Sequence, residues 1–122
     1  MNNTIRRIIF LKKAVALINF ACLNGIDFIV YTFYRTTEEQ KKRYAQGRTE
    51  PGRIVTYCDG VKKRSAHQDW LAWDIVIIKN GKPIWQRTND YELLGKFWKE
   101  LGGIWGGDWE LNDVYHFEYR GG

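Results

Sequence analysis

One run of eight residues constrains the fold more than any other part of the chain. Residues 71–78 read LAWDIVII, and only Asp74 among them is polar. A short apolar run rich in β-branched residues is typical of a buried strand. Lys79-Asn-Gly-Lys82 follows and predicts a hairpin turn into a second strand at residues 83–85. A carboxylate inside such a strand is costly unless a partner or a metal ion satisfies its oxygens, so Asp74 needs an explanation.

The other periodic segments predict three helices and two further strands. Thr36 and Glu39 have the spacing of a capping box, which places a helix start at this point. The helices are expected at about residues 6–23, 37–46 and 89–101, and the strands at about 27–35 and 115–119. Few strands alternate with helices and a hairpin is present, so the fold class is α+β with a small antiparallel β-sheet.

The first helix is expected to bury one apolar face against the rest of the protein. Its apolar residues recur at i, i+3, i+7 and i+10, namely Ile8, Leu11, Val15 and Ile18. Arg6 and Arg7 before an apolar stretch resemble the start of a secretion signal, but a pair of lysines interrupts that stretch. The uncharged run at 14–25 is too short to cross a membrane. We therefore expect no signal peptide and no membrane insertion.

Length and charge limit the classes of protein that the chain can belong to. The 122 residues predict one domain, 1–122, and we expect a monomer. A hydrophobic content of 44%, with 16% aromatic residues, indicates a folded globular protein. The formal net charge of +5 favours an anionic partner, such as nucleic acid or an acidic cell-wall polymer. The basic residues are scattered along the sequence, so an ordinary solvated surface explains them equally well.

Three side chains are candidates for one metal site. Side chains alternate along a strand, so Asp74 and His116 face each other if their two strands pair. His67, in the loop that leads into the first of these strands, could fold over the same place. Two imidazole nitrogens and one carboxylate oxygen, with a position left open, form the pattern of a catalytic zinc site. Taken singly, each of the three is more often an ordinary core or surface residue.

Two charged residues could add catalytic chemistry to that site. Asp113 lies three residues before His116 and could take a proton from a water molecule that attacks a carbonyl. Asp108 and Glu110 are alternatives for this base, and Asp113 could also be a simple turn residue. Arg35, at the end of a predicted strand, could bind a substrate carboxylate or a developing oxyanion. A surface salt bridge would explain Arg35 equally well.

The order of these motifs resembles a known family. Ser65-x-His67-x6-Asp74, followed by Asp113-x-x-His116, is similar to the SxHxxxxAxD and (D/E)xxH signatures of the M15 zinc peptidases. That family contains D-alanyl-D-alanine carboxypeptidases and dipeptidases, and phage endolysins that cut L-alanyl-D-glutamate bonds. The endolysin branch is further indicated by other segments that look like its members, namely Tyr34-Arg-Thr36, Glu39-Gln40, Tyr44-Ala-Gln-Gly-Arg-Thr49, Pro51-Gly52, Leu94-Gly-Lys-Phe-Trp98, Gly102-Gly-Ile-Trp-Gly-Gly107 and His116-Phe-Glu118.

The resemblance implies a fold, a cofactor and a set of site residues. The fold is the Hedgehog/DD-peptidase type, a small antiparallel sheet with packed helices. The cofactor is zinc, bound by His67, Asp74 and His116. Asp113 is implied as the catalytic base and Arg35 as the group that polarises the substrate carbonyl or holds a carboxylate. Ser65 and Gln40 would line the cleft.

The chain departs from the family pattern at two tryptophans beside the implied zinc site. Trp70 stands where glycine is frequent, and Trp73 precedes Asp74 in place of a small aliphatic residue. Both are expected to contact substrate and to reshape the pocket.

The resemblance also implies a substrate and a place of action. The implied function is an endolysin that is made in the host cytoplasm and cleaves the L-Ala-D-Glu bond of peptidoglycan stem peptides. A D-Ala-D-Ala carboxypeptidase is the alternative. A non-enzymatic nucleic-acid-binding domain would explain the charge but would leave the carboxylate of Asp74 without a reason, so no nucleic-acid partner is expected.

Overall fold

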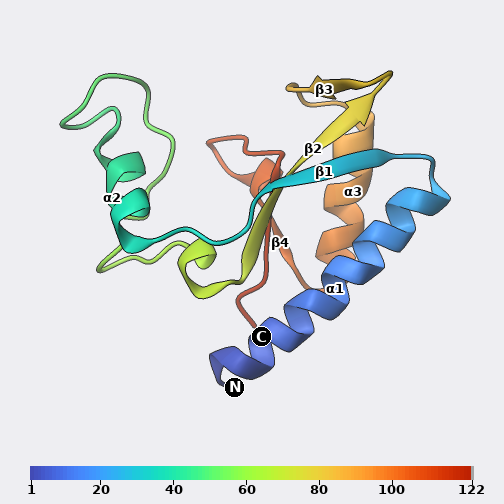
Figure 1. The fold of residues 1–122 in the computed structure, drawn as a ribbon, viewed down its shortest axis with the longest axis horizontal. Coiled ribbons are helices and arrows are strands. Elements are labelled where there is room, and N and C mark those ends of the chain that lie inside the picture. Colours follow the sequence, from blue (N-terminus) through green and yellow to red (C-terminus); the bar gives the residue numbers. More distant parts are fainter. Residues whose placement is uncertain (122) are drawn as a thin grey trace.

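One antiparallel sheet, with two long helices packed together against it, organises the protein (Figure 1). The computed structural model describes residues 1–121. Its helices are α1 (Asn3–Leu23), α2 (Thr37–Ala45) and α3 (Asn89–Glu100), with 3-10 turns η1 (Ala66–Asp69) and η2 (Gly106–Asp108). Its strands are β1 (Asp27–Thr32), β2 (Ala72–Lys79), β3 (Lys82–Ile84), β4 (Ile104–Trp105) and β5 (His116–Glu118). The predicted α+β class with a small antiparallel sheet is confirmed.

Strand β2 is the centre of the sheet. It pairs with β1, with β3 and with β5, and the strand order is β1-β2-β5-β4. The hairpin into β3 turns at Asn80 and Gly81, both with positive φ, as an Asn-Gly turn of this type requires. In the ladder between β2 and β5, Asp74 lies opposite His116. The two strands therefore do pair, in the register that brings the two polar residues together.

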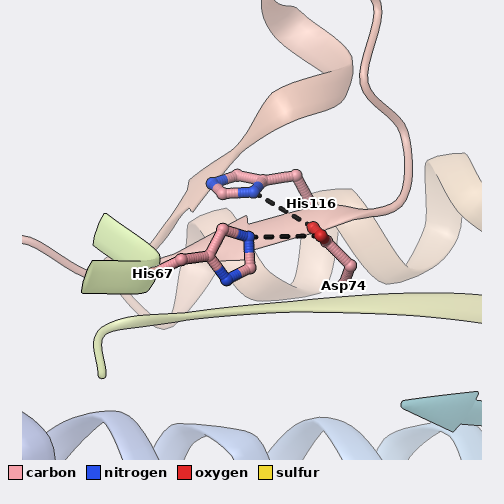
Figure 2. A group of neighbouring side chains, drawn as sticks. All are labelled: His67, Asp74 and His116. Atoms are coloured by element: carbon pink, nitrogen blue, oxygen red, sulfur yellow. Dashed lines mark hydrogen bonds and ion pairs between the residues drawn. The ribbon is translucent and has the colours of Figure 1, made fainter. Parts of the chain in front are cut away.

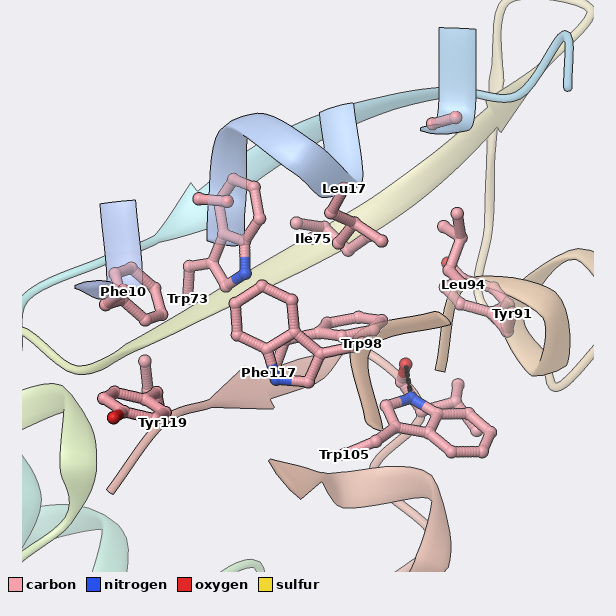
Figure 3. Close-up of a cluster of buried hydrophobic side chains, with 14 of the residues drawn as sticks. Phe10, Leu17, Trp73, Ile75, Tyr91, Leu94, Trp98, Trp105, Phe117 and Tyr119 are labelled. Carbon is pink, nitrogen blue, oxygen red and sulfur yellow. Dashed lines mark hydrogen bonds between the residues drawn. The ribbon is translucent and has the colours of Figure 1, made fainter. Parts of the chain in front are cut away.

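A cluster of aromatic rings fills the space between the sheet and the helices (Figure 3). The ring of Trp98 on α3 is fully buried, with its centroid 5.7 Å from that of Phe10 and 5.9 Å from that of Phe117. Its indole nitrogen donates a hydrogen bond to the carbonyl oxygen of Glu118 on β5, at 2.9 Å. Such rings contribute both a large buried area and edge-to-face contacts. The cluster therefore stabilises β2 and β5, the strands that carry Asp74 and His116.

A glycine lets α3 approach the sheet closely. Gly95 lies in the interior of α3, where glycine costs about 1 kcal/mol relative to alanine. A Cβ atom at this position would lie 2.2 Å from the indole ring of Trp105. The absence of a side chain on Gly95 therefore allows the Trp105 ring to lie close to the helix.

The buried face of α1 is not the predicted one. The fully or nearly fully buried residues are Phe10, Ala14, Leu17 and Ala21. The predicted set, Ile8, Leu11, Val15 and Ile18, is 42–56% exposed. Both sets have helical spacing, so periodicity alone could not distinguish them. The actual face places one aromatic ring, that of Phe10, among the tryptophans of the core.

The ends of the elements follow local signals in most places. Thr36 caps α2 through the predicted capping box with Glu39, and α1 ends at Asn24 and Gly25. Strand β1 is shorter than predicted and ends at Thr32, and its register with β2 shifts between Val30 and Thr32. Within residues 1–121, the helices all lack the combination of length and apolar character that a membrane span requires.

Candidate active site

Three buried side chains from separate elements meet at one point (Figure 2). Asp74 comes from β2, His116 from β5 and His67 from η1. One ligand atom of each lies within 4.8 Å of the others. His67 Nε2 is 3.2 Å from Asp74 Oδ2, and His116 Nδ1 is 3.2 Å from Asp74 Oδ1. The structure thus brings together the three residues that the sequence singled out.

Neighbouring backbone groups fix the orientation of the His67 ring. Ser65 caps η1, accepting a hydrogen bond from the His67 amide, and so sets the turn that carries the ring. The ring nitrogen Nδ1 lies 2.8 Å from the carbonyl oxygen of Phe33. A carbonyl only accepts, so Nδ1 carries the proton and Nε2 presents a lone pair. This Nε2 atom is buried and has no hydrogen-bond partner within residues 1–121.

The His116 ring is fixed in the same way by a carboxylate. Its Nε2 lies 2.7 Å from Glu118 Oε1, and Arg120 binds the other oxygen of Glu118 at 2.6 Å. Glu118 therefore favours a proton on Nε2 and a lone pair on Nδ1, which points to Asp74. The sequence reading gave Glu118 no role, although the period of two along the strand already placed it on the same face as His116.

The geometry of these atoms fits a metal ion. With protons on the outer ring nitrogens, two imidazole lone pairs and a carboxylate oxygen face one another with no donor between them. A cation at this point would satisfy all three, and the set matches the nitrogen and oxygen ligands of zinc. Histidine ligands commonly bind a carboxylate or backbone carbonyl through their other nitrogen. Glu118 and Phe33 provide these partners here.

In the absence of a cation, a proton takes part in the same network. Burial lowers the pKa of His116, but hydrogen bonds to Asp74 and Glu118 outweigh burial and raise it to about 9. Burial raises the pKa of Asp74, but the hydrogen bond from His116 and the neighbouring imidazoles reverse this effect and hold that pKa below its usual range. Protons and a cation therefore compete for these atoms.

A cleft of about 460 Å³ opens over the three side chains. Asp113 lines it, and burial raises the pKa of this carboxyl group. Glu110 also lines the cleft but is exposed. Asp108 points elsewhere and pairs with Lys99 at 2.9 Å, so it is not a candidate base. Other lining residues that bear on the chemistry are Arg35, Arg43, Ser65 and Trp109.

Arg35 is a buried residue of the cleft and not a surface ion pair. Its side chain lies 3.7 Å from Asp74 Oδ2 and donates to Gln40 Oε1 at 2.9 Å. Gln40 is fully buried and donates in turn to the carbonyl oxygen of Cys58. Gln40 was expected to line the cleft, but its side chain is buried and does not line it. It instead accepts a hydrogen bond from the Arg35 guanidinium.

The two tryptophans also lie elsewhere than expected. Trp73 is buried on the opposite face of β2 from Asp74, with its ring 6.1 Å from that of Phe10. Trp70 stacks on Tyr34 at a centroid distance of 4.4 Å and borders a separate groove with Arg7 and Leu11. Strand alternation places Trp73 in the core, and the left-handed backbone at Trp70 turns its ring outward. Neither residue lines the cleft over Asp74.

Comparison with known proteins identifies a family. Residues 59–119 match the profile of the M15 peptidase family described as D-alanyl-D-alanine carboxypeptidase. The peptidoglycan L-alanyl-D-glutamate endopeptidase CwlK of Bacillus subtilis (strain 168) is 38% identical over 117 residues, which cover 88% of this chain and 69% of CwlK.

Two solved structures share the fold. A zinc-bound mutant of the vancomycin resistance D,D-pentapeptidase VanY, from a VanB-type resistance cassette, gives a TM-score of 0.57 at 25% identity, over 92% of this chain and 71% of VanY. The L-Ala D-Glu endopeptidase ChiX of Serratia marcescens gives a TM-score of 0.54 at 24% identity, over 78% of this chain and 68% of ChiX. With the CwlK and profile matches, these findings show that the chain belongs to the M15 family of zinc-dependent peptidases.

Proposed function

We propose that this protein is an endopeptidase that hydrolyses the L-Ala-D-Glu bond of peptidoglycan stem peptides. The observation that carries the proposal is the meeting of two imidazole lone pairs and a carboxylate at the floor of an open cleft. The choice of bond is supported by the 38% identity to CwlK, which is an L-alanyl-D-glutamate endopeptidase. The proposal includes action as a phage endolysin, which is supported by the sequence segments that resemble that branch.

His67, Asp74 and His116 are the residues that would hold zinc in this proposal. Zinc in such a site supplies a Lewis acid, which lowers the pKa of water and polarises a carbonyl group. The ring orientations are set by Phe33 O and Glu118, so the ligand atoms are positioned before the ion binds.

Asp113 is the proposed general base. It takes the proton from the attacking water and then delivers it to the leaving amine nitrogen. A base works best when its pKa approaches the working pH, and burial moves the pKa of Asp113 in that direction. Asp113 lines the cleft, so its carboxyl group can reach a water molecule bound there.

Arg35 is proposed to bind the substrate beside the scissile amide. A D-Glu residue carries its α-carboxylate next to the amide nitrogen that is cut, and a guanidinium is a suitable partner for it. One terminal nitrogen of Arg35 donates to Gln40, the other lies 3.7 Å from Asp74 Oδ2, and the residue lines the cleft in which a substrate carboxylate would bind. Ser65 contributes by fixing the turn under His67.

A D-Ala-D-Ala carboxypeptidase remains the second candidate, because that activity is the description of the matching family profile. Its substrate also carries a carboxylate near the scissile amide, so Arg35 does not separate the two. Digestion of purified peptidoglycan with the zinc-loaded protein, followed by mass spectrometry of the products, distinguishes them. New N-terminal D-Glu supports the endopeptidase, whereas released D-Ala supports the carboxypeptidase. Products with neither terminus would overturn both.

The proposal also treats residues 1–122 as one peptidase domain that acts as a monomer. A single aromatic core joins the sheet to both long helices, which supports one folding unit. Light scattering after size-exclusion chromatography, run alongside the digestion, checks the oligomeric state of the active species.

A further inference from the structure

Helix α1 presents a second apolar face to solvent. This outer stripe consists of Ile8, Leu11, Val15 and Ile18, each between 42% and 56% exposed. Other residues of the same helix, Phe10, Ala14, Leu17 and Ala21, are buried in the core. A helix that packs on one side and is solvated on the other normally carries polar residues on its outer side. The outer stripe departs from that pattern over about three turns, which indicates a contact that the isolated chain does not make.

The charge on α1 has one sign. Its 21 residues include no Asp or Glu and four basic residues. Three of the four donate hydrogen bonds to neutral carbonyl oxygens: Arg6 to Arg120, Arg7 to Asp69 and Lys13 to Leu101. A carbonyl satisfies the donor without cancelling its charge. The fourth, Lys12, is exposed beside the outer stripe. An apolar stripe with basic residues beside it matches the surface of an anionic lipid bilayer.

Aromatic residues continue the outer stripe at one end. Leu11 shares a groove of about 260 Å³ with Arg7, Phe33 and Trp70. Trp70 stacks on Tyr34, and both rings are exposed. Tryptophan and tyrosine are enriched at the boundary between lipid headgroups and acyl chains, because each has an apolar body and a polar edge. This placement gives Trp70, which does not line the cleft, a role at the surface.

The position of α1 leaves the cleft free. Along β2, Trp73 and Ile75 belong to the core cluster with α1 residues, while Asp74 lies on the alternate face under the cleft. Helix α1 and the cleft are therefore on opposite sides of the sheet. The outer-stripe residues do not line the cleft, so a surface that contacts them would leave the cleft residues free.

A second copy of this chain fits the outer stripe less well. A two-fold contact between two antiparallel α1 helices would be centred near residue 13, midway between Ile8 and Ile18. Such a contact would bring Lys12 of each copy close to the same basic segment of the other, with no acidic residue on either helix. Like charges at close range oppose this pairing of two copies. Anionic lipid headgroups would instead attract the same basic residues.

We propose that α1 binds peripherally to anionic lipid bilayers through Ile8, Leu11, Val15 and Ile18, with Lys12, Trp70 and Tyr34 at the headgroup level. The helix lies in the plane of the bilayer surface and does not cross it, in accord with the absence of a spanning helix in residues 1–121. The inference goes beyond the proposed peptidase function and does not rest on it, because binding is measured without substrate.

Co-sedimentation of the zinc-loaded protein with lipid vesicles tests the proposal. We expect binding to phosphatidylglycerol-containing vesicles and at least about tenfold weaker binding to pure phosphatidylcholine vesicles, because basic residues near an anionic surface each add attraction. The double variant Leu11→Gln/Val15→Gln should bind the anionic vesicles roughly tenfold more weakly than wild type, since it loses buried apolar area. Lys12→Gln should lower binding roughly fivefold.

The matched control is Ile29→Gln/Val61→Gln, which changes two aliphatic residues outside α1 that are 54% and 62% exposed. This control should bind like wild type, and circular dichroism checks that all variants are folded. The proposal is wrong if wild type ignores anionic vesicles, or if the Leu11/Val15 variant binds them as well as the control does. Sedimentation equilibrium without lipid gives a further check: a dimer that the Leu11/Val15 substitutions abolish would assign the outer stripe to a second copy instead.

Discussion

The two faces of β2 are built on different principles, although their residues alternate along one strand. On one face, Trp73 and Ile75 are buried against α1 and α3, and contact area provides the stability. On the other face, Asp74 is buried among imidazole and guanidinium groups, and paired polar atoms provide the order. A shift of one residue in register would exchange the two sets. Pairing with β5 therefore specifies the core and the site at once.

The two faces should respond differently to substitution. A core face loses stability in proportion to the volume removed, and neighbouring side chains relax to reduce part of the loss. A polar face loses function when one member is removed, because the remaining charged groups lose a specific partner. Substitution of a residue that lines the cleft without holding the buried polar network, such as Asp113, should lower activity with little change in stability. Substitution in the core should show the reverse.

The largest effect is expected for Asp113→Asn on the cleft face. The amide cannot accept the proton from water, so kcat should fall by about 10²- to 10⁴-fold. Zinc content, measured by elemental analysis, and the unfolding midpoint should stay close to wild type. Glu110→Gln is the control, because this exposed carboxylate lines the same cleft. If Glu110→Gln loses activity while Asp113→Asn does not, the base has been assigned to the wrong residue.

The core face should show its largest effect at Trp98. Trp98→Ala removes the ring between Phe10 and Phe117 and the hydrogen bond to Glu118 O, which should cost about 3–5 kcal/mol of unfolding free energy. Urea denaturation followed by circular dichroism measures this loss. Trp85→Ala, at an exposed tryptophan, should stay within about 1 kcal/mol of wild type. Equal losses at the two tryptophans would contradict the assignment of stability to this face.

A smaller effect is expected at Glu118 on β5, which contacts the core through its backbone carbonyl and the cleft residue His116 through its side chain. Glu118→Gln keeps the size of the side chain but removes the charge that orients and polarises His116, so zinc affinity should fall by about 10- to 100-fold. Competition with a chromogenic chelator measures this affinity without any peptidase assay. The same titration on Glu110→Gln should give the wild-type value. An unchanged affinity in Glu118→Gln would show that His116 is held by packing alone.

The sequence predicted those features that depend on local spacing. The Thr36 capping box and the Asn80-Gly81 turn each follow from a short-range rule. Strand alternation put Asp74 and His116 on faces that could meet, but the pairing of the two strands was only a condition of that argument. It could not give the side of α1 that is buried, because apolar residues lie on both of its faces. It also could not show that Gln40 stands behind Arg35, since that contact depends on how α2 packs.

Glu118 couples metal binding to the stability of the folded protein. Its backbone carbonyl is anchored by the Trp98 ring of the core, and its side chain holds His116 at the cleft. Loosening of β5 would thus release the metal ligand and the core together, and a bound ion would in turn delay that opening. Bound zinc should therefore raise the resistance of the protein to thermal unfolding, and the protein should unfold sooner in a zinc-poor medium.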